Sequence, residues 1–254
     1  MATMHPGALP SHPIHGHIGL GEPLRWVAQG LHDFRRAPGL GLAYGLMVTA
    51  LGWVVFSLGN HPYFIAAAVS GFLLVGPVLG AGLIEASRAL EAGERPTFDT
   101  SLRGLTRNAP NLRLLAVVLL AIAAAWLAAS AWVLTATLGA IAPSVEQTLW
   151  DNALMRMSPG QWLAWAVIGG VLAVLSFSIS VIAVPLILDR NASAGEAVRG
   201  SLHAVARHPV ACAEWALVIV LLTVVGFATL LVGLIVIYPV LGHASWHAYR
   251  ALGE

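Results

Sequence analysis

The sequence predicts an all-α integral membrane protein with six transmembrane helices, and three observations support this. Apolar residues make up 58% of the 254-residue chain and charged residues only 10%, whereas a soluble domain carries roughly 25% charged residues. Several long stretches contain no charge at all, and each exceeds the roughly 20 residues that a helix needs to cross a bilayer. The basic side chains, which are all arginines, fall between these stretches.

Four uncharged stretches define the six helices. The first stretch is divided by the turn-forming sequence Gly59-Asn60-His61-Pro62, and the fourth, which is too long for one span, is divided near Gly226. Backbone groups inside lipid must be hydrogen-bonded within their own segment, which favours helices over open strands. The predicted transmembrane helices are 39–59, 62–85, 113–139, 162–188, 209–225 and 228–248.

The arginines also predict the orientation, because loops rich in Lys and Arg stay on the cytoplasmic side. All arginines except Arg156 fall on one side of the predicted membrane. We therefore expect a multi-pass protein of the bacterial cytoplasmic (inner) membrane with both termini in the cytoplasm. Residues 1–23 are expected to form a disordered tail rich in His, Pro and Gly, and residues 24–254 the membrane domain. A net charge of +1 gives no reason to expect nucleic acid as a partner.

Three cytoplasmic segments resemble one another. Each contains a leucine (Leu31, Leu102, Leu202), an arginine five residues later and a proline soon after. Pro77-Val-Leu-Gly80 and Pro239-Val-Leu-Gly242 also match, and the charged motifs that follow them match as well. We expect three parallel repeats, each with an interfacial amphipathic helix followed by a helical hairpin. The segment Leu24–Phe34 would be the first interfacial helix, and a capping box at Ser193 and Glu196 would start the third.

Two pairs of potential metal ligands lie on the last two predicted helices. His208 and Cys212 are four residues apart, as are His243 and His247, so each pair shares one helix face. In an antiparallel hairpin the two pairs would lie at similar depth, a set that suits zinc, copper or haem. Two alternatives are a proton-linked role of the histidines and an aromatic anchor at the headgroup level formed by residues 243–250.

A further group of polar residues is expected near the inner leaflet. Ionisable residues within a membrane are functional candidates, although these lie close enough to the interface to pair with arginines or to extend to the headgroups. The group comprises Glu85, Asp189, Glu214, Arg88 and Arg250. The chain contains no glycine-rich phosphate loop, zinc-protease motif or nucleophile elbow. These features favour a function other than catalysis.

Several distinct motifs are distributed over about residues 24 to 252. They include Leu24-Arg25-Trp26, Gly76-Pro77-Val78-Leu79, Glu85-Ala-Ser-Arg88, Pro185-Leu186-x-Leu188-Asp189-Arg190 and Gly242-His243-Ala-Ser-Trp246-His247-Ala-Tyr249-Arg250. Together they resemble the bacterial integral membrane family called domain of unknown function 2189. Some relatives in that family carry the label cytochrome c oxidase subunit I. The resemblance implies an association with respiratory complexes and supplies no catalytic residues, because a haem–copper oxidase needs more spans and more intramembrane histidines than this chain has.

Three functional hypotheses follow. The leading hypothesis is an accessory, assembly or scaffolding factor that contacts the lipid bilayer and a membrane complex, with a respiratory oxidase as the candidate partner. The second is a metal- or haem-binding membrane protein that uses the His/Cys set. The third is a small solute or ion transporter or channel, with Glu85 and His247 in equivalent positions near its inner mouth.

Overall fold

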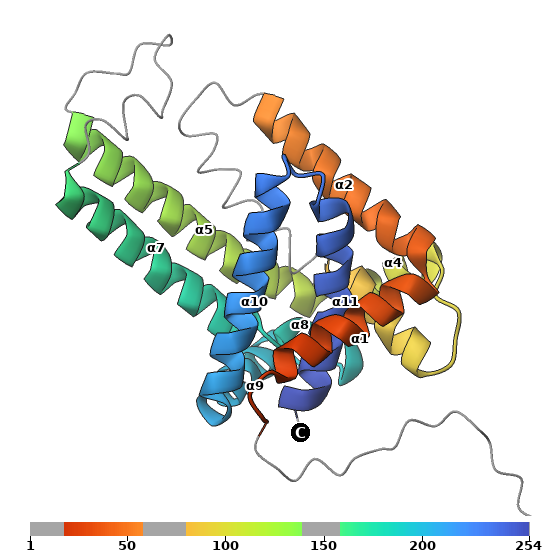
Figure 1. Cartoon of the computed structure of the whole chain (residues 1–254). Helices are drawn as coiled ribbons and strands as arrows, with labels where there is room; N and C mark the ends of the chain where they lie inside the picture. Colours follow the sequence, from red (N-terminus) through yellow and green to blue (C-terminus); the bar gives the residue numbers. More distant parts are fainter. Residues whose placement is uncertain (1–17, 58–79, 139–157, 254) are drawn as a thin grey trace, which may run out of the picture.

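The computed structural model describes residues 18–57, 80–138 and 158–253, and no strand occurs among them (Figure 1). The expected all-α class is therefore confirmed. Residues 80–91 are also helical, and we refer to them as the 80–91 helix. The labelled helices are α1 (Glu22–Arg36), α2 (Pro38–Ser57), α4 (Phe98–Arg107), α5 (Ala109–Leu138), α7 (Pro159–Ser180), α8 (Ala183–Asp189), α9 (Ala194–Arg207), α10 (Pro209–Ala228) and α11 (Leu234–Leu252).

Three of the described segments are long and apolar enough to cross a membrane, namely Ala109–Ser130, Pro159–Asp189 and Pro209–Ala228. A fourth is added if α1 and α2, which meet at 107°, are counted as one broken span. The predicted span 62–85 lies mostly outside the described residues. The predicted span 228–248 corresponds to α11, which begins after a turn at residues 229–233. This helix is not among the candidate spans, because it carries more polar side chains than the others.

Three short amphipathic helices, α1, α4 and α9, each lead into a long apolar helix through one residue of nearly the same conformation. The junction residues have φ/ψ of −136°/57° at Ala37, −134°/51° at Asn108 and −127°/56° at His208. In each case the junction carbonyl accepts a hydrogen bond from the N–H four residues later, at 3.2, 3.1 and 3.0 Å. A proline follows one or two residues after each junction residue, where it is tolerated because the first turn of a helix has unpaired N–H groups.

The predicted fourth span is interrupted within its last third. Pro185 has no N–H to donate to the carbonyl of Val181, and the helix breaks at Val181–Ile182 between α7 and α8. The N–H of Ile182 instead donates to the Ser201 hydroxyl of α9 at 3.4 Å. The predicted capping box is confirmed, since Ser193 and Glu196 cap the first turn of α9 reciprocally. Pro239, by contrast, lies inside a continuous α11.

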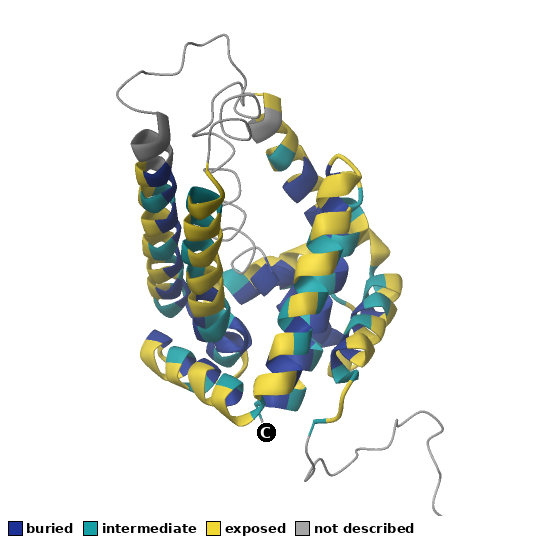
Figure 2. Ribbon diagram, turned by 60° about the vertical axis from the view of Figure 1, so that its left-hand side comes forward, coloured by how far each residue is buried: buried dark blue, intermediate teal, exposed yellow. Residues whose placement is uncertain are grey.

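Helix α11 lies at the centre of the described structure and packs against α1, α2 and α10 (Figure 1). The core around it includes an edge-to-face pair between Trp26 and Trp215, with ring centroids 5.7 Å apart. Helices α5, α7 and α10 present long exposed faces on the outside (Figure 2). The apolar core is thus concentrated at the end of the molecule where α1, α4, α8 and α9 lie.

The predicted interfacial helix Leu24–Phe34 lies within α1, and the structure shows which of its residues face the protein. Its buried face is formed by Pro23, Trp26, Gly30 and Asp33, whereas Leu24 is 64% exposed. Gly30 lies so close to α11 that a Cβ atom there would come within 2.5 Å of the Val240 carbonyl oxygen. The protein-facing side of α1 therefore combines Trp26 with small and polar residues, and Leu24 on its apolar side remains exposed.

Candidate functional site

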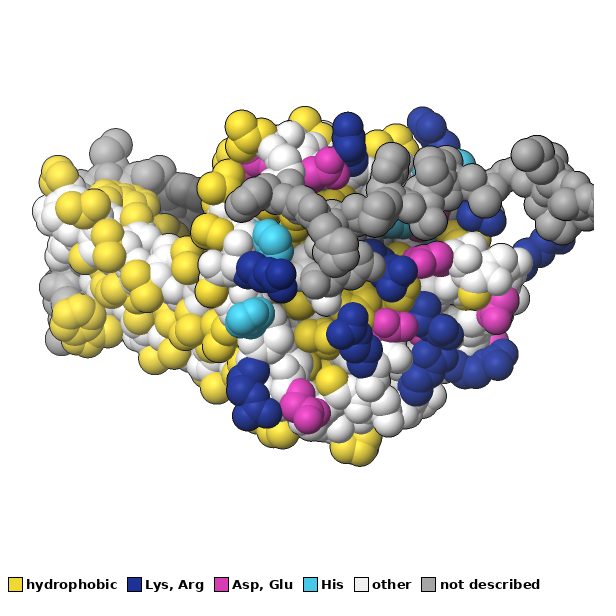
Figure 3. Space-filling model, turned by 90° about the horizontal axis from the view of Figure 1, so that it is seen from below, with side chains coloured by type: hydrophobic (Ala, Val, Ile, Leu, Met, Phe, Trp, Pro, Cys, Tyr) yellow, Lys and Arg dark blue, Asp and Glu magenta, His cyan; other side chains and the backbone are white. Residues whose placement is uncertain are grey.

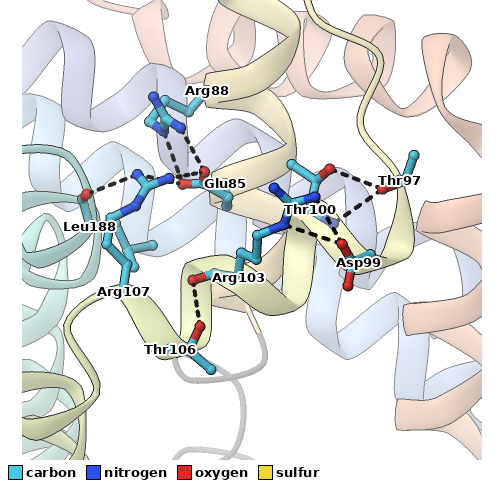
Figure 4. A network of polar contacts seen from close by, with 9 residues as sticks. All are labelled: Glu85, Arg88, Thr97, Asp99, Thr100, Arg103, Thr106, Arg107 and Leu188. Atoms are coloured by element: carbon cyan, nitrogen blue, oxygen red, sulfur yellow. Dashed lines mark hydrogen bonds and ion pairs between the residues drawn. The ribbon is translucent and has the colours of Figure 1, made fainter.

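A buried carboxylate, Glu85, is held by two arginines (Figure 4). Its side chain is 1% exposed. Arg88 donates to both carboxylate oxygens at 2.9 and 2.7 Å, and Arg107 of α4 does the same at 2.7 and 3.2 Å. The paired geometry offsets the cost of burying the charge, because each oxygen accepts charge-assisted hydrogen bonds. The hydrogen bonds to Glu85 raise the pKa of Arg88.

The local sequence explains this arrangement. Glu85 and Arg88 are three residues apart on the 80–91 helix, so their side chains meet on one face. Gly104 allows α4 to approach this helix, since a Cβ atom at Gly104 would lie 2.8 Å from the Glu85 Cβ. Arg107 Nη1 also donates to the Leu188 carbonyl oxygen at 3.4 Å. Glu85 and Arg107 together therefore link three elements: the 80–91 helix, α4 and the end of α8.

A second buried carboxylate, Asp33 of α1, accepts two hydrogen bonds at Oδ2. The donors are the Ser87 hydroxyl at 2.8 Å and His247 Nε2 at 2.9 Å. Burial raises the pKa of Asp33, but hydrogen bonds from His247 and Ser87 outweigh it, so the pKa lies below its usual value of 3.8. The carboxylate is thus held in its charged form between α1, α11 and the 80–91 helix.

The same network fixes the tautomer of His243. Ser87 has one hydroxyl hydrogen, which it donates to Asp33, so His243 Nδ1, 2.8 Å from the hydroxyl oxygen, acts as the donor to Ser87. Nε2 of this fully buried imidazole then carries a lone pair, and it has no hydrogen-bond partner in the described part of the chain. Asp33, Ser87 and His243 form a chain of groups in which each orients the next.

The C-terminal part of α11 contacts several neighbouring elements. Trp246 Nε1 donates to Glu91, which also forms an ion pair with Arg250 at 3.3 Å. Tyr249 donates its hydroxyl to Asp189 at 2.7 Å, and the Arg190 guanidinium lies 6.0 Å from the centre of the Tyr249 ring. Together with the hydrogen bond from His247 to Asp33, these contacts join α11 to α1, α8 and the 80–91 helix.

The structure does not gather the four predicted metal ligands into one group. No three His, Cys, Asp or Glu side chains are placed to hold a metal ion in the ranges 18–57, 80–138 and 158–253. His243 contacts Ser87 and His247 contacts Asp33, whereas Cys212 Sγ lies 4.0 Å from the Ala204 carbonyl oxygen. His208 is the junction residue between α9 and α10.

The predicted inner-leaflet residues form separate contacts. Glu85 and Arg88 form an ion pair, but Arg250 pairs with Glu91. Glu214 accepts a hydrogen bond from the Gly21 N–H at 3.0 Å and so fixes the start of α1. The pairing of these polar groups with partners from other helices could not be read from the sequence, because it depends on how each helix is rotated about its axis.

The aromatic-anchor interpretation of residues 243–250 is wrong. Trp246 is 2% and Tyr249 1% exposed, so neither ring is available to the headgroup layer. Both residues are surrounded by protein and hydrogen-bonded to carboxylates. The amphipathic character of Trp and Tyr, which suits a membrane interface, suits the boundary between an apolar core and a polar layer equally well.

Four residues of these networks were not among the predicted site residues: Asp33, Ser87, Glu91 and Arg107. One signal was available. Asp33 is the last of the residues, three or four apart, that α1 buries, and Ser87 lies between the two charged residues of the motif Glu85-Ala-Ser-Arg88. A buried polar residue needs a partner, which identifies both as candidates for hydrogen bonding.

Comparison with known proteins gives a family. The model of a family described as "predicted integral membrane protein (DUF2189)" matches residues 64–189. Over these residues the chain is similar to that family. The DUF2189 match includes Glu85, Ser87, Arg88 and Arg107, whereas Asp33 and α11 lie outside it. Its description names no reaction and does not confirm the oxidase label. No curated protein and no solved structure matches the chain.

Proposed function

We propose that this protein acts by lateral binding within the membrane, as an accessory, assembly or scaffolding factor for a membrane complex. One observation carries the proposal. Buried polar side chains pair with each other, as Glu85 does with Arg88 and Arg107, while apolar side chains on the long helices remain exposed. Of the apolar stretches with which α5 and α10 could cross a membrane, only 28% and 22%, respectively, are buried inside the protein.

The exposed apolar faces are continuous along the helices. On α7 the exposed residues Leu163, Val167, Val171 and Val174 follow a spacing of three or four, which places them on one face. Lipid covers such a face when no partner is bound. A partner helix packs on it without changing the contacts of the buried polar side chains. A respiratory oxidase is the candidate partner suggested by the label of some relatives.

The proposed topology has six spans in three parallel repeats, with both termini in the cytoplasm of a bacterium and the protein in the inner membrane. The three junction residues of nearly identical conformation support the repeat. Contacts between successive units support it further. The 80–91 helix meets α4 through Glu85 and Arg107, α8 meets α9 at Ser201, and α11 meets α1 through His247 and Asp33, which closes a ring.

Photo-crosslinking in native membranes tests the binding function. A photoreactive amino acid replaces Val171 of α7 or Val220 of α10, which are 63% and 56% exposed. A matched control carries it at Ala28, an exposed residue on the charged side of α1. We expect a crosslinked protein partner from one of the span positions and not from Ala28. Recovery of the uncrosslinked polypeptide alone from both span positions, and from mild-detergent extracts, contradicts the proposal.

A metal- or haem-binding function is the second candidate, and one observation favours it. His243 Nε2 has no partner among the described residues, while Ser87, itself bonded to Asp33, holds Nδ1, the arrangement by which proteins orient a ligating histidine. Copper, zinc or haem would be the group bound. Elemental analysis and an absorbance spectrum of protein purified from native membranes test this, with His243→Ala as the comparison. Equal metal content and equal spectra in the two proteins contradict it.

A transport function would need Glu85 and His247 at an inner mouth. In the structure Glu85 is bonded to two arginines and His247 to Asp33. We therefore rank transport below the two functions above. Uptake or leak of solutes in proteoliposomes containing the protein would favour the transport function over the other two.

A further inference from the structure

The three amphipathic helices α1, α4 and α9, which we call the collar helices, share a surface pattern. Each has a buried side of small residues, such as Gly30, Gly104 and Ala204, that packs on a neighbouring element. A second side bears apolar side chains that the protein leaves exposed. Those more than 40% exposed are Leu24, Phe98, Leu102 and Leu202. The third side is polar and carries arginines.

The direction of the collar helices suits a membrane surface. Helix α1 turns by 107° into α2, so it lies across the direction of the spans. In Figure 1 α1 and α9 lie in the lower half of the molecule and α4 lies near its middle, and the long apolar helices extend upward from them. A helix with one apolar side and one basic side, lying across the spans, occupies the boundary between acyl chains and headgroups.

The arginines of the collar helices fall into two classes. Arg25, Arg103 and Arg107 form ion pairs with Glu22, Asp99 and Glu85, at 2.8, 2.8 and 2.7 Å. Arg35, Arg36, Arg199 and Arg207 are exposed, and among the described residues none of them has an ion pair with a carboxylate. Viewed from this end, basic side chains are spread over the surface and apolar ones cover its flank (Figure 3). The second class has positive charge that the protein itself does not neutralise.

We propose that the collar helices bind the phosphate headgroups of anionic phospholipids, with Arg35, Arg36 and Arg207 as the charged contacts and the exposed leucines and Phe98 inserted beside the acyl chains. Charge complementarity selects the occupant. Guanidinium groups bind phosphate through paired donors, and basic residues beside a bilayer attract anionic lipid. The exposed apolar side chains favour a lipid over an acidic soluble protein, because they need an apolar environment next to the charges.

The experiment compares lipid selection by variants reconstituted into nanodiscs of phosphatidylcholine with a minor fraction of phosphatidylglycerol. Phosphatidylglycerol retained per protein is measured by mass spectrometry. The test variant is Arg35→Gln/Arg36→Gln, and the matched control is Arg25→Gln/Arg103→Gln, which removes the same number of exposed arginines but only paired ones. We expect enrichment of phosphatidylglycerol to fall by about fivefold for each unpaired arginine removed and to change little in the control.

Wild-type protein gives a second measurement that does not depend on the variants. Enrichment should fall as salt is raised from low ionic strength to about 0.5 M, because salt screens exposed charges. Equal enrichment in the test variant and the wild type overturns the proposal, as does an equal loss in both double variants. Enrichment that does not respond to salt also overturns it. Circular dichroism of each variant verifies that helix content is unchanged.

Discussion

His247 Nε2 lies 2.9 Å from Asp33 Oδ2, so a hydrogen bond joins the last helix of the chain to the first across 214 positions of sequence. Since Ser87 also donates to Asp33, three separate elements meet at one carboxylate. The stability of the fold should therefore respond strongly to this residue.

Asp33→Asn tests that expectation. An amide at this position accepts less strongly and introduces a donor beside Ser87 and His247, so we expect the free energy of unfolding to fall by about 2 kcal/mol. Denaturant titration in mild detergent, followed through the protein's tryptophans, measures it. The control Asp99→Asn removes an exposed ion pair with Arg103 and should cost less than about 0.5 kcal/mol. Equal losses in the two variants would contradict a larger contribution of the buried network to the free energy of unfolding.

The effect of Asp33 should depend on pH in a defined direction. Its pKa in the folded protein is lowered below the usual 3.8. A lowered folded-state pKa contributes stability that is fully present above the unfolded-state pKa and is lost as pH falls through the folded-state pKa. The contribution of the Asp33 carboxylate, measured as the difference in unfolding free energy between wild type and Asp33→Asn, should therefore shrink as pH falls below about pH 4. A difference that is the same at about pH 3 as at about pH 5 would contradict this assignment.

Glu85→Ala should be more damaging than loss of either arginine. It leaves two guanidinium groups without their carboxylate, a change that costs roughly 3–5 kcal/mol for a fully buried pair. Arg88 and Arg107 keep 30% and 38% of their side-chain surface exposed, so water compensates in part and we expect about 2–3 kcal/mol. Arg107→Ala leaves Glu85 with Arg88 and should cost less. Unfolding titrations of the three proteins give the order, and the reverse order would contradict the two-arginine clamp.

Gly30→Ala tests the close packing of α1 on α11. The new Cβ atom would lie within 2.5 Å of the Val240 carbonyl oxygen and 2.7 Å of the Ala244 nitrogen, so the two backbones must separate. We expect a loss of about 1–3 kcal/mol, as for other overpacked sites. The matched control is Gly39→Ala in the first turn of α2, where nothing lies within 4 Å of the added atom. A Gly30→Ala protein with the same free energy of unfolding as the wild type would contradict the close packing of α1 on α11.

The sequence predicted the positions of many helices because length, apolar composition and proline placement act locally. The change of direction at Ala37, between α1 and α2, and the helix break four residues before Pro185 follow from such local rules. The partners of the charged residues did not follow. Glu85 was expected to pair with arginines or to extend to the headgroups, but its contact with Arg107 depends on the rotation and approach of α4. Likewise, the burial of Trp246 depends on neighbours that composition does not reveal.

The central claim is that α1, α4 and α9 lie on one side of the membrane, the cytoplasmic side. Single cysteines at Arg25, Arg103 or Arg199 test it, in a background in which the only natural cysteine, the buried Cys212, is replaced by alanine. A thiol reagent that does not cross membranes is applied to intact cells and to permeabilised cells. We expect no labelling at any of the three positions in intact cells and labelling at all three after permeabilisation. Labelling of any one of them from outside intact cells would contradict the claim.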